Sequence, residues 1–345
     1  MKVLVVNNMA PFLWGGAESL AEHLKKNIEI TGHQAEILRI PFQWEPATRI
    51  PSQMLMARAF ELWNVDHVIA LKFPAYLIRH PRKTLWLVHQ YRQAYDLFDA
   101  GQTNLPDGQL GSDLRHVIKN ADDECFREAR AIYTISDVTQ RRLAHYNGFA
   151  AHVLRQPIND PELFVGGEPG SYIFAGGRVN VMKRQHLLLD AMTHAAPGTR
   201  LVIAGPPDGE EDAARLRRIV EELRLGDRVK LDLRFLGRDE YASYLNSASA
   251  VACLPYDEDS LSYVAMEAAN AGKPLISTTD SGGVLSLAKN DETGWVVEPS
   301  DEALAEAMGA ALADEARSRR LGSGAKDLWQ SLGVTWPKTV EALLS

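Results

Sequence analysis

The stretch from Leu254 to Ser277 constrains the fold of this chain more than any other. An apolar, strand-like run stops at Pro255, and an acidic loop follows it. The apolar residues beyond the loop recur at helical spacing: Val264, Ala265, Ala268 and Ala269. Gly272 and Pro274 end this helix before the next apolar run begins. The order strand, loop, short helix, turn and strand is typical of a parallel α/β sheet.

Asp259 and Glu267 frame the start of the expected helix, with seven residues between them. Asp259 lies in the loop, and Glu267 lies about one turn into the helix. A loop that enters a helix after a parallel strand presents backbone N–H groups to anionic ligands. Because the two carboxylates would repel phosphate, we expect them to accept hydrogen bonds from sugar and ribose hydroxyls.

Short apolar runs alternate with helical patterns along the whole chain. In the first half, strands are expected at Val3–Val6, Ala35–Ile40, Val65–Leu71, Thr84–Val88, Ala131–Ile135 and His152–Leu154. In the second half they are expected at Tyr172–Ala175, Arg200–Ala204, Val229–Phe235, Val251–Leu254 and Gly294–Val297. This alternation predicts an α/β protein with doubly wound, Rossmann-like parallel sheets, and 345 residues are enough for two such domains. Gln156–Gly170, rich in Pro, Gly and acidic residues, is the expected linker.

Composition excludes several classes of protein. The net charge of −8 and the pI near 5.7 argue against a nucleic-acid-binding protein, which usually has a basic face. Cys125 and Cys253 lie far apart without metal-ligand spacing, which favours a reduced, cytosolic protein. The N-terminal apolar run is too short for a signal peptide, and no apolar stretch is long enough to span a membrane.

Two turns between a strand and a helix have the composition of phosphate-binding sites. Gly15 and Gly16 precede the expected helix Ala17–Ile30, and glycines let the backbone approach a ligand closely. They do not form the Gly-x-Gly-x-x-Gly fingerprint, which argues against a nicotinamide dehydrogenase; an ordinary strand-to-helix turn is the alternative. Arg178 and Lys183 are two cations beside another such turn, where they can hold a diphosphate without a metal. Solvated surface charges are the alternative for this pair.

Two other features have a functional and an ordinary structural interpretation. His89 ends the strand Thr84–Val88, at the edge where parallel sheets bind ligands. A histidine that is simply hydrogen-bonded at a strand end is the alternative. The basic cluster Arg79–Lys83 is interpreted as a solvated turn, with contact to an anionic lipid or a phosphorylated acceptor as the alternative.

These motifs resemble those of the retaining glycosyltransferases of family 4, which have the GT-B fold. The family's usual pattern is Glu-x7-Glu followed by Ala-x-Gly-x-Pro, and here Asp259-x7-Glu267 is followed by Gly272-Lys-Pro274. Three residues depart from the pattern: Asp259 stands in place of Glu, Ser262 in place of Gly, and Asn270 in place of Ala. The match extends to Ser281-Gly-Gly283, and Gly15-Gly16-Ala-Glu18 is similar to the family's Gly-Gly-x-Glu start.

The resemblance implies two Rossmann-like domains that face each other across a cleft. Residues 1–165 would form the acceptor domain, residues 166–325 the nucleotide-sugar domain, and residues 326–345 a helix that crosses back to the first domain. The irregular segments Trp44–Pro51 and Tyr91–Leu110 then become candidates for acceptor recognition, with ordinary surface loops as the alternative.

The resemblance also implies roles for the candidate residues. Arg178 and Lys183 would stabilise the leaving diphosphate, Glu267 would bind ribose, and Asp259 would bind the donor sugar. His89 would orient the sugar or the acceptor, and Arg238 could stack on the base, although an exposed arginine at a helix start is the plainer interpretation. The remaining donor contacts would come from the two turns: Gly15, Gly16, Ser262, Tyr263 and Val264. No metal or cofactor is expected.

The expected reaction is the transfer of a sugar, with retention, from a UDP-, GDP- or ADP-sugar to an acceptor hydroxyl. Polysaccharide, glycolipid or small-glycoside synthesis would be its setting, in the cytoplasm, with weak contact to the inner face of the membrane left open. Three alternatives remain: a nucleotide-sugar 2-epimerase on the same fold, a catalytically silent nucleotide-sugar-binding protein, and a hinged sugar-binding protein. The last would need an export signal.

Overall fold

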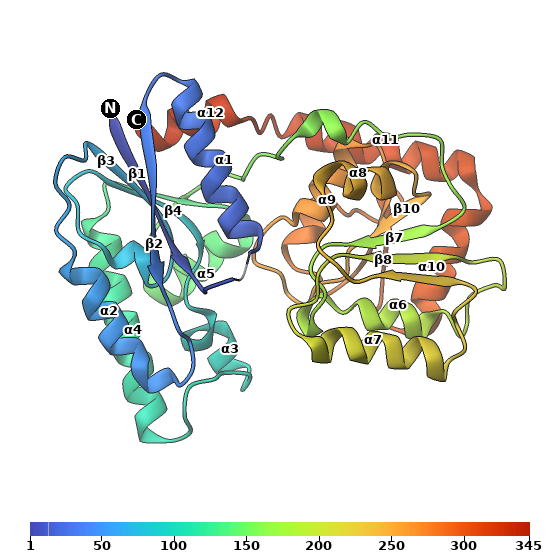
Figure 1. The fold of residues 1–345 in the computed structure, drawn as a ribbon, viewed down its shortest axis with the longest axis horizontal. Coiled ribbons are helices and arrows are strands. Elements are labelled where there is room, and N and C mark those ends of the chain that lie inside the picture. The colour runs from blue at the N-terminus through green and yellow to red at the C-terminus, as the bar shows by residue number, and fades with distance from the viewer. Residues whose placement is uncertain (13) are drawn as a thin grey trace. The chain divides into compact units, whose positions relative to one another are not determined.

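The computed structural model describes residues 1–12 and 14–345, and it divides into two compact units. Unit 1 comprises Met1–Pro157 and Val334–Ser345, and unit 2 comprises Ile158–Gly333. Each unit contains one sheet of six parallel strands with helices packed against it (Figure 1). The expectation of an α/β protein with two Rossmann-like parallel sheets is therefore confirmed.

The sheet of unit 1 has the strand order β2-β1-β3-β4-β5-β6. Its strands are β1 (Lys2–Met9), β2 (Gln34–Pro41), β3 (His67–Lys72), β4 (Lys83–His89), β5 (Ala131–Thr134) and β6 (His152–Val153). Its helices are α1 (Gly16–Ile30), α2 (Ile50–Ala59), α3 (Asp96–Asp99), α4 (Gln109–Glu128), α5 (Asp137–Asn147) and α12 (Trp336–Leu344). Because β2 and β3 lie on opposite sides of β1, the topological switch point of this sheet lies between β1 and β3, beside the turn that leads into α1.

Helix α12 completes the core of unit 1 although it lies at the far end of the sequence. The centroid of the Trp336 ring lies 6.4 Å from that of His23 in α1 and 6.3 Å from that of Trp86 in β4. Val340 and Leu343 are buried with the apolar face of α1. Pro337 lies in the first turn of α12, where its missing N–H has no helical partner to lose.

The basic cluster Arg79–Lys83 is not simply the solvated turn that the sequence suggested. Lys83 is fully buried in β4, where its ammonium group donates to the carbonyl oxygens of Tyr76 at 3.2 Å and Ile78 at 3.0 Å. Arg79 remains exposed, as expected. The error arises because a lysine that follows a turn can enter a strand when backbone carbonyls accept its protons.

The sheet of unit 2 has the strand order β12-β11-β10-β7-β8-β9. Its strands are β7 (Ile173–Gly176), β8 (Leu201–Ala204), β9 (Val229–Asp232), β10 (Ala250–Ala252), β11 (Leu275–Thr278) and β12 (Gly294–Val297). Its helices are α6 (Gln185–Ala191), α7 (Glu210–Glu222), α8 (Arg238–Asn246), α9 (Tyr263–Asn270), α10 (Asp301–Ala313) and α11 (Glu315–Ser331). The chain proceeds from β7 to β8 and β9, and then returns to place β10 on the other side of β7. The switch point of this sheet therefore lies between β7 and β10.

The sequence analysis did not predict α11, although its buried residues Leu321, Ala325 and Trp329 repeat at helical spacing. Gly322 and Gly324 obscure the pattern, and packing requires both, since a Cβ atom on Gly324 would lie 2.3 Å from the carbonyl oxygen of Glu292. A Cβ atom on Gly322 would lie 2.0 Å from the carbonyl oxygen of Gly272, in the turn after α9. The absence of a side chain at Gly322 therefore lets α11 pack directly on this turn.

We predict that Gly322→Ala lowers the free energy of unfolding by about 1–3 kcal/mol, because the methyl group forces α11 away from the Gly272 turn. Gly309→Ala in α10 is the matched control, since a Cβ atom there meets nothing within 4 Å. The control should gain up to about 1 kcal/mol from the better helix propensity of alanine. Urea-induced unfolding measures both, and equal effects at the two positions would contradict the packing argument.

Candidate functional site

The switch point of unit 2 brings together the turn after β7 and the start of α9. Gly177 has a φ of +98°, and a Cβ atom on it would lie 3.2 Å from Cγ2 of Val264. A Cβ atom on Gly176 would lie 2.5 Å from the hydroxyl oxygen of Tyr241 in α8. The two glycines therefore allow this turn to pass close to the N-terminus of α9, which begins at Tyr263 after Ser262.

The acidic loop before α9 is supported by the glycine-containing segment after β11. The N–H of Asp257 donates to the carbonyl oxygen of Asp280 at 2.9 Å, and the N–H of Gly283 donates to that of Glu258 at 2.8 Å. Gly282 has a φ of +63°, and a Cβ atom on it would lie 2.5 Å from backbone atoms of Glu258. This contact gives a structural reason for the Ser-Gly-Gly sequence, and it fixes the loop in which Asp259 is 5% exposed.

The two predicted phosphate-binding cations each have a carboxylate partner. The ammonium group of Lys183 pairs with the carboxylate of Glu258 in the acidic loop. Nη1 of Arg178 lies 3.0 Å from Oδ1 of Asp208, in the loop after β8. The structure thus brings Lys183 to the acidic loop, whereas it ties Arg178 to a neighbouring loop at the same edge of the sheet.

Arg184 is a residue of the site that the sequence analysis missed. Its guanidinium donates to both carboxylate oxygens of Asp280, at 2.7 and 2.8 Å. It also donates to the carbonyl oxygens of Leu254 at 2.8 Å and Pro255 at 3.1 Å. Arg184 lowers the pKa of Asp280 by hydrogen bonding to its charged form. The only sequence signal was its place beside Lys183, since the loops that it joins are up to 96 residues away.

Arg238 lies at the start of α8 with its side chain 36% exposed, as the plainer interpretation expected, but its guanidinium also pairs with the buried carboxylate of Glu267. Nη1 of Arg238 lies 2.6 Å from Oε1 of Glu267, and Nη2 donates to the carbonyl oxygen of Asn159 at 2.8 Å. The guanidinium also lies over the ring of Phe164, 4.6 Å from its centroid. Burial raises the pKa of Glu267 to about 7, against the opposing effect of Arg238.

The remaining candidates belong to unit 1. Gly15 precedes the first residue of α1, Gly16, and its N–H donates to Oε2 of Glu18 at 2.9 Å. Glu18 therefore caps the start of α1. His89 is the last residue of β4, and Nδ1 of its partly exposed ring lies 2.6 Å from the carbonyl oxygen of Gln90. Because a carbonyl oxygen can only accept, Nδ1 carries the proton in this contact.

Among the described residues, no group of three or more His, Cys, Asp or Glu is arranged to hold a metal ion. In the same part of the chain, no helix combines the length and apolar character needed to cross a bilayer. Cys125 and Cys253 are both buried and do not form a disulfide.

The fold is that of GT-B glycosyltransferases. Sucrose-phosphate synthase from Thermosynechococcus elongatus aligns with 99% of this chain and 96% of its own, with a TM-score of 0.78 and 18% identity. HepE from Anabaena, solved in complex with UDP-glucose, aligns with 99% of this chain and 98% of its own, with a TM-score of 0.72 and 18% identity. At these identities the likeness establishes the fold.

The family model matches unit 2, and the curated relatives match about half of the chain. Residues 165–328 match the family model described as "Glycosyl transferases group 1". A D-inositol 3-phosphate glycosyltransferase from Xylanimonas cellulosilytica is 31% identical over 174 residues, which are 50% of this chain and 40% of that protein. A glycogen synthase from Mycobacterium tuberculosis is 33% identical over 159 residues, 44% of this chain and 36% of that protein. The matches thus cover less than half the length of each relative.

We predict that Arg238→Gln lowers the free energy of unfolding by at least about 2 kcal/mol, because it leaves the carboxylate of Glu267 buried without its partner. The loss should be larger at pH 8 than at pH 6. Without the guanidinium, the folded-state pKa of Glu267 rises further above its unfolded value, so stability falls as pH rises through it.

The matched control for this variant is Arg234→Gln, which breaks an exposed ion pair with Glu240. Its effect should stay within about 1 kcal/mol. Denaturant unfolding of both variants at the two pH values makes the comparison. An Arg238 variant as stable as the control would show that the buried pair contributes nothing to stability.

Proposed function

We propose that the protein is a retaining glycosyltransferase that moves a sugar from a nucleotide-diphosphate sugar to an acceptor hydroxyl. One observation carries the proposal. The unit that matches the glycosyl transferases group 1 model gathers Lys183, the acidic loop and the start of α9 at its topological switch point. Ligands of open α/β sheets bind at such points.

A nucleotide sugar is the proposed donor, and UDP-sugars are the first candidates. HepE, which shares the fold, was solved with UDP-glucose. Backbone N–H groups at the start of α9, from Ser262 to Val264, and at Gly16 are suited to diphosphate oxygens, whereas the N–H of Gly15 is taken by Glu18. GDP- and ADP-sugars remain in the proposal because the residues described above do not discriminate between bases.

The main contribution to catalysis is assigned to electrostatic stabilisation of the leaving diphosphate. Lys183 would exchange its contact with Glu258 for a phosphate oxygen, and Arg178 would do the same with Asp208. A diphosphate carries more charge than a single carboxylate and can compete for both cations. The side chains therefore supply the positive charge in this proposal, with no metal or cofactor.

The carboxylates and the histidine are assigned to substrate positioning. Glu267, held by Arg238, would accept hydrogen bonds from ribose hydroxyls, and Asp259 from hydroxyls of the donor sugar. Since Nδ1 of His89 is engaged by a carbonyl oxygen, Nε2 is its atom for the sugar or the acceptor. Recognition of the acceptor is assigned to unit 1, with the segment Tyr91–Leu110 as the first candidate. The expected setting is the cytoplasm.

We predict that UDP, GDP or ADP, or one of their sugars, raises the melting temperature of the protein. A ligand at about 100 times its dissociation constant adds roughly 2.7 kcal/mol of stability. A thermal-shift panel measures this, and no shift with any member would count heavily against a transferase. With the working donor, turnover should require a second, hydroxyl-bearing substrate. Turnover of the donor alone to an epimer would instead indicate an epimerase, and binding without turnover a silent relative.

We predict that Lys183→Ala lowers turnover by about 10²–10³, the usual cost of removing one donor that stabilises transition-state charge. The exposed Lys289, in the loop before β12, provides the matched control. Lys289→Ala should leave turnover within a few-fold of the wild type. If the two variants behave alike in steady-state assays with the working donor, Lys183 has no part in the mechanism.

A further inference from the structure

Unit 2 contains a cavity of about 660 Å³ at the edge of the sheet opposite the candidate site. Its lining includes residues that directly precede β7, β10 and β11, so it lies at the amino ends of these strands. The rest of the lining comes from the linker after Phe164, from the turn after α9, from Gly198 before β8, and from α10 and α11. The volume falls within the range of small-molecule sites, about 300–1,000 Å³.

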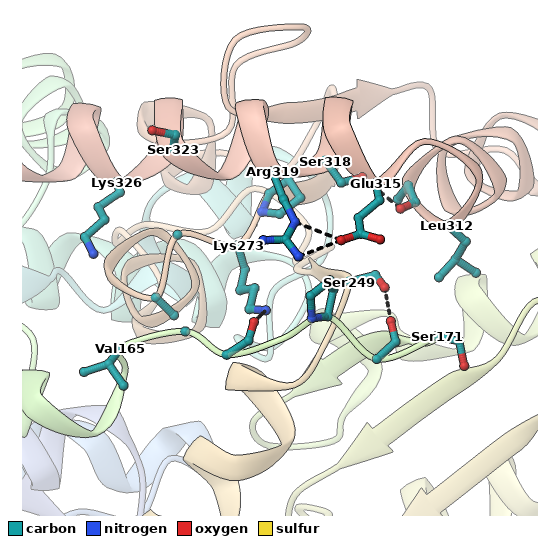
Figure 2. Close-up of a pocket in the computed structure, with 18 of the residues that line it drawn as sticks. Val165, Ser171, Ser249, Lys273, Leu312, Glu315, Ser318, Arg319, Ser323 and Lys326 are labelled. Carbon is teal, nitrogen blue, oxygen red and sulfur yellow. Dashed lines mark hydrogen bonds and ion pairs between the residues drawn. The ribbon is translucent and has the colours of Figure 1, made fainter.

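The charged side chains that line the cavity are mostly basic. Lys273, Arg319 and Lys326 contribute three cations, and Glu315 is the one carboxylate among the lining residues. Figure 2 shows Lys273 beside the paired Arg319 and Glu315, with Lys326 projecting from α11 toward the same side. Arg319 pairs with Glu315 at 2.7 Å and with Glu168 at 3.0 Å, so its charge is already balanced. Neither Lys273 nor Lys326 has an ion-pair partner among the described residues, although Glu168 lies near enough to favour the charged form of Lys273.

Lys273 is the central feature of this cavity. It is only 6% exposed, and its ammonium group donates to the carbonyl oxygen of Gly167 at 2.9 Å. Among the described residues, no carboxylate lies within 4 Å of this group, although a buried ammonium is normally paired with one. Burial is the main cause that lowers the pKa of Lys273, and the charge of the nearby Arg319 lowers it further. An anion bound beside Lys273 would favour its charged form and so offset both effects.

Lys326 supplies a second cation without a partner in the described part of the chain. A Cβ atom on Gly272 would lie 3.9 Å from Cδ of Lys326, so the lysine stem passes the turn that precedes Lys273. Ser171 and Ser323 add hydroxyl groups to the lining. Two ammonium groups without a carboxylate partner among the described residues suit the oxygens of a phosphate, and the remaining volume accommodates more than a phosphate alone.

We propose that this cavity binds a small phosphorylated metabolite of sugar-phosphate size, with its phosphate held between Lys273 and Lys326. The site is separate from the candidate donor site, because it lies at the other edge of the same sheet. Lys273, the middle residue of the Gly272-Lys-Pro274 motif, thereby has a role in ligand binding, while Gly272 and Pro274 shape the turn.

Isothermal titration of the full chain with glucose 6-phosphate, inorganic phosphate and glucose tests the proposal. Both phosphate-bearing probes should bind, and glucose should not. Lys326→Glu should weaken binding of glucose 6-phosphate by about tenfold or more, a change of roughly 1.4 kcal/mol. Lys289→Glu, with the same charge change at an exposed position outside the lining, should leave the affinity unchanged.

Two further variants make the location testable. Lys273→Met should abolish binding of glucose 6-phosphate, and circular dichroism checks that this variant still folds. If Lys273→Met does not fold, the binding of Lys326→Glu alone tests the location of the site. Lys183→Ala should bind glucose 6-phosphate as the wild type does. The proposal is overturned if no phosphate-bearing probe binds at millimolar concentration. It is equally overturned if Lys183→Ala loses binding while Lys326→Glu keeps it.

Discussion

The ion pair between Arg184 and Asp280 holds together the loops on which the candidate site depends. A two-pronged contact between guanidinium and carboxylate fixes orientation as well as distance. The same guanidinium donates hydrogen bonds to the carbonyl oxygens of Leu254 and Pro255, where the chain passes from β10 into the acidic loop. Arg184 has a φ of +53°, which non-glycine residues seldom adopt, and its contacts compensate for this conformation. Lys183 therefore projects from a fixed segment.

The cations of the candidate site are all paired with acidic side chains, and this affects selectivity. Lys183, Arg178 and Arg238 contact Glu258, Asp208 and Glu267, respectively. A ligand that separates such a pair must offer more charge than the carboxylate it replaces. In the proposed reaction a diphosphate meets this condition and a neutral sugar does not. Paired cations thus favour a nucleotide sugar over a free sugar before any sugar hydroxyl is recognised.

Much of the fold could be predicted from the sequence because the parallel strands are buried on both faces. Runs such as Val68–Leu71 and Ala250–Ala252 are apolar and buried over their whole length, and glycine or proline marks the turns between elements. The prediction failed where packing decides the conformation. Gly322 weakened the helical pattern of α11, because this position lacks a side chain so that the helix can contact another turn. Lys83 was expected at the surface, because the sequence does not show the carbonyl oxygens that accept its protons in the folded chain.

The candidate site residues were chosen from local patterns, such as Asp259-x7-Glu267 and the glycines beside it. The structure pairs Lys183 with Glu258, the residue before Asp259. The partners of these residues were not predictable. Arg238 lies 29 positions from Glu267, and Asp280 lies 96 from Arg184, and a single sequence does not show which distant charges meet. Pairing across such separations follows from strand order, which the sequence pattern leaves open.

Unit 1 is discontinuous in the chain, and this has a consequence for its biogenesis. Val340 and Leu343 of α12 are buried with Val3, Leu20 and Trp86, which are made first. Residues 1–157 therefore leave the ribosome with part of their apolar surface uncovered, and it stays so while all of unit 2 is translated. Until residues 334–345 emerge, the nascent first domain is a natural client for chaperones. Fragments that end before α12 should expose the same apolar surface and therefore tend to aggregate.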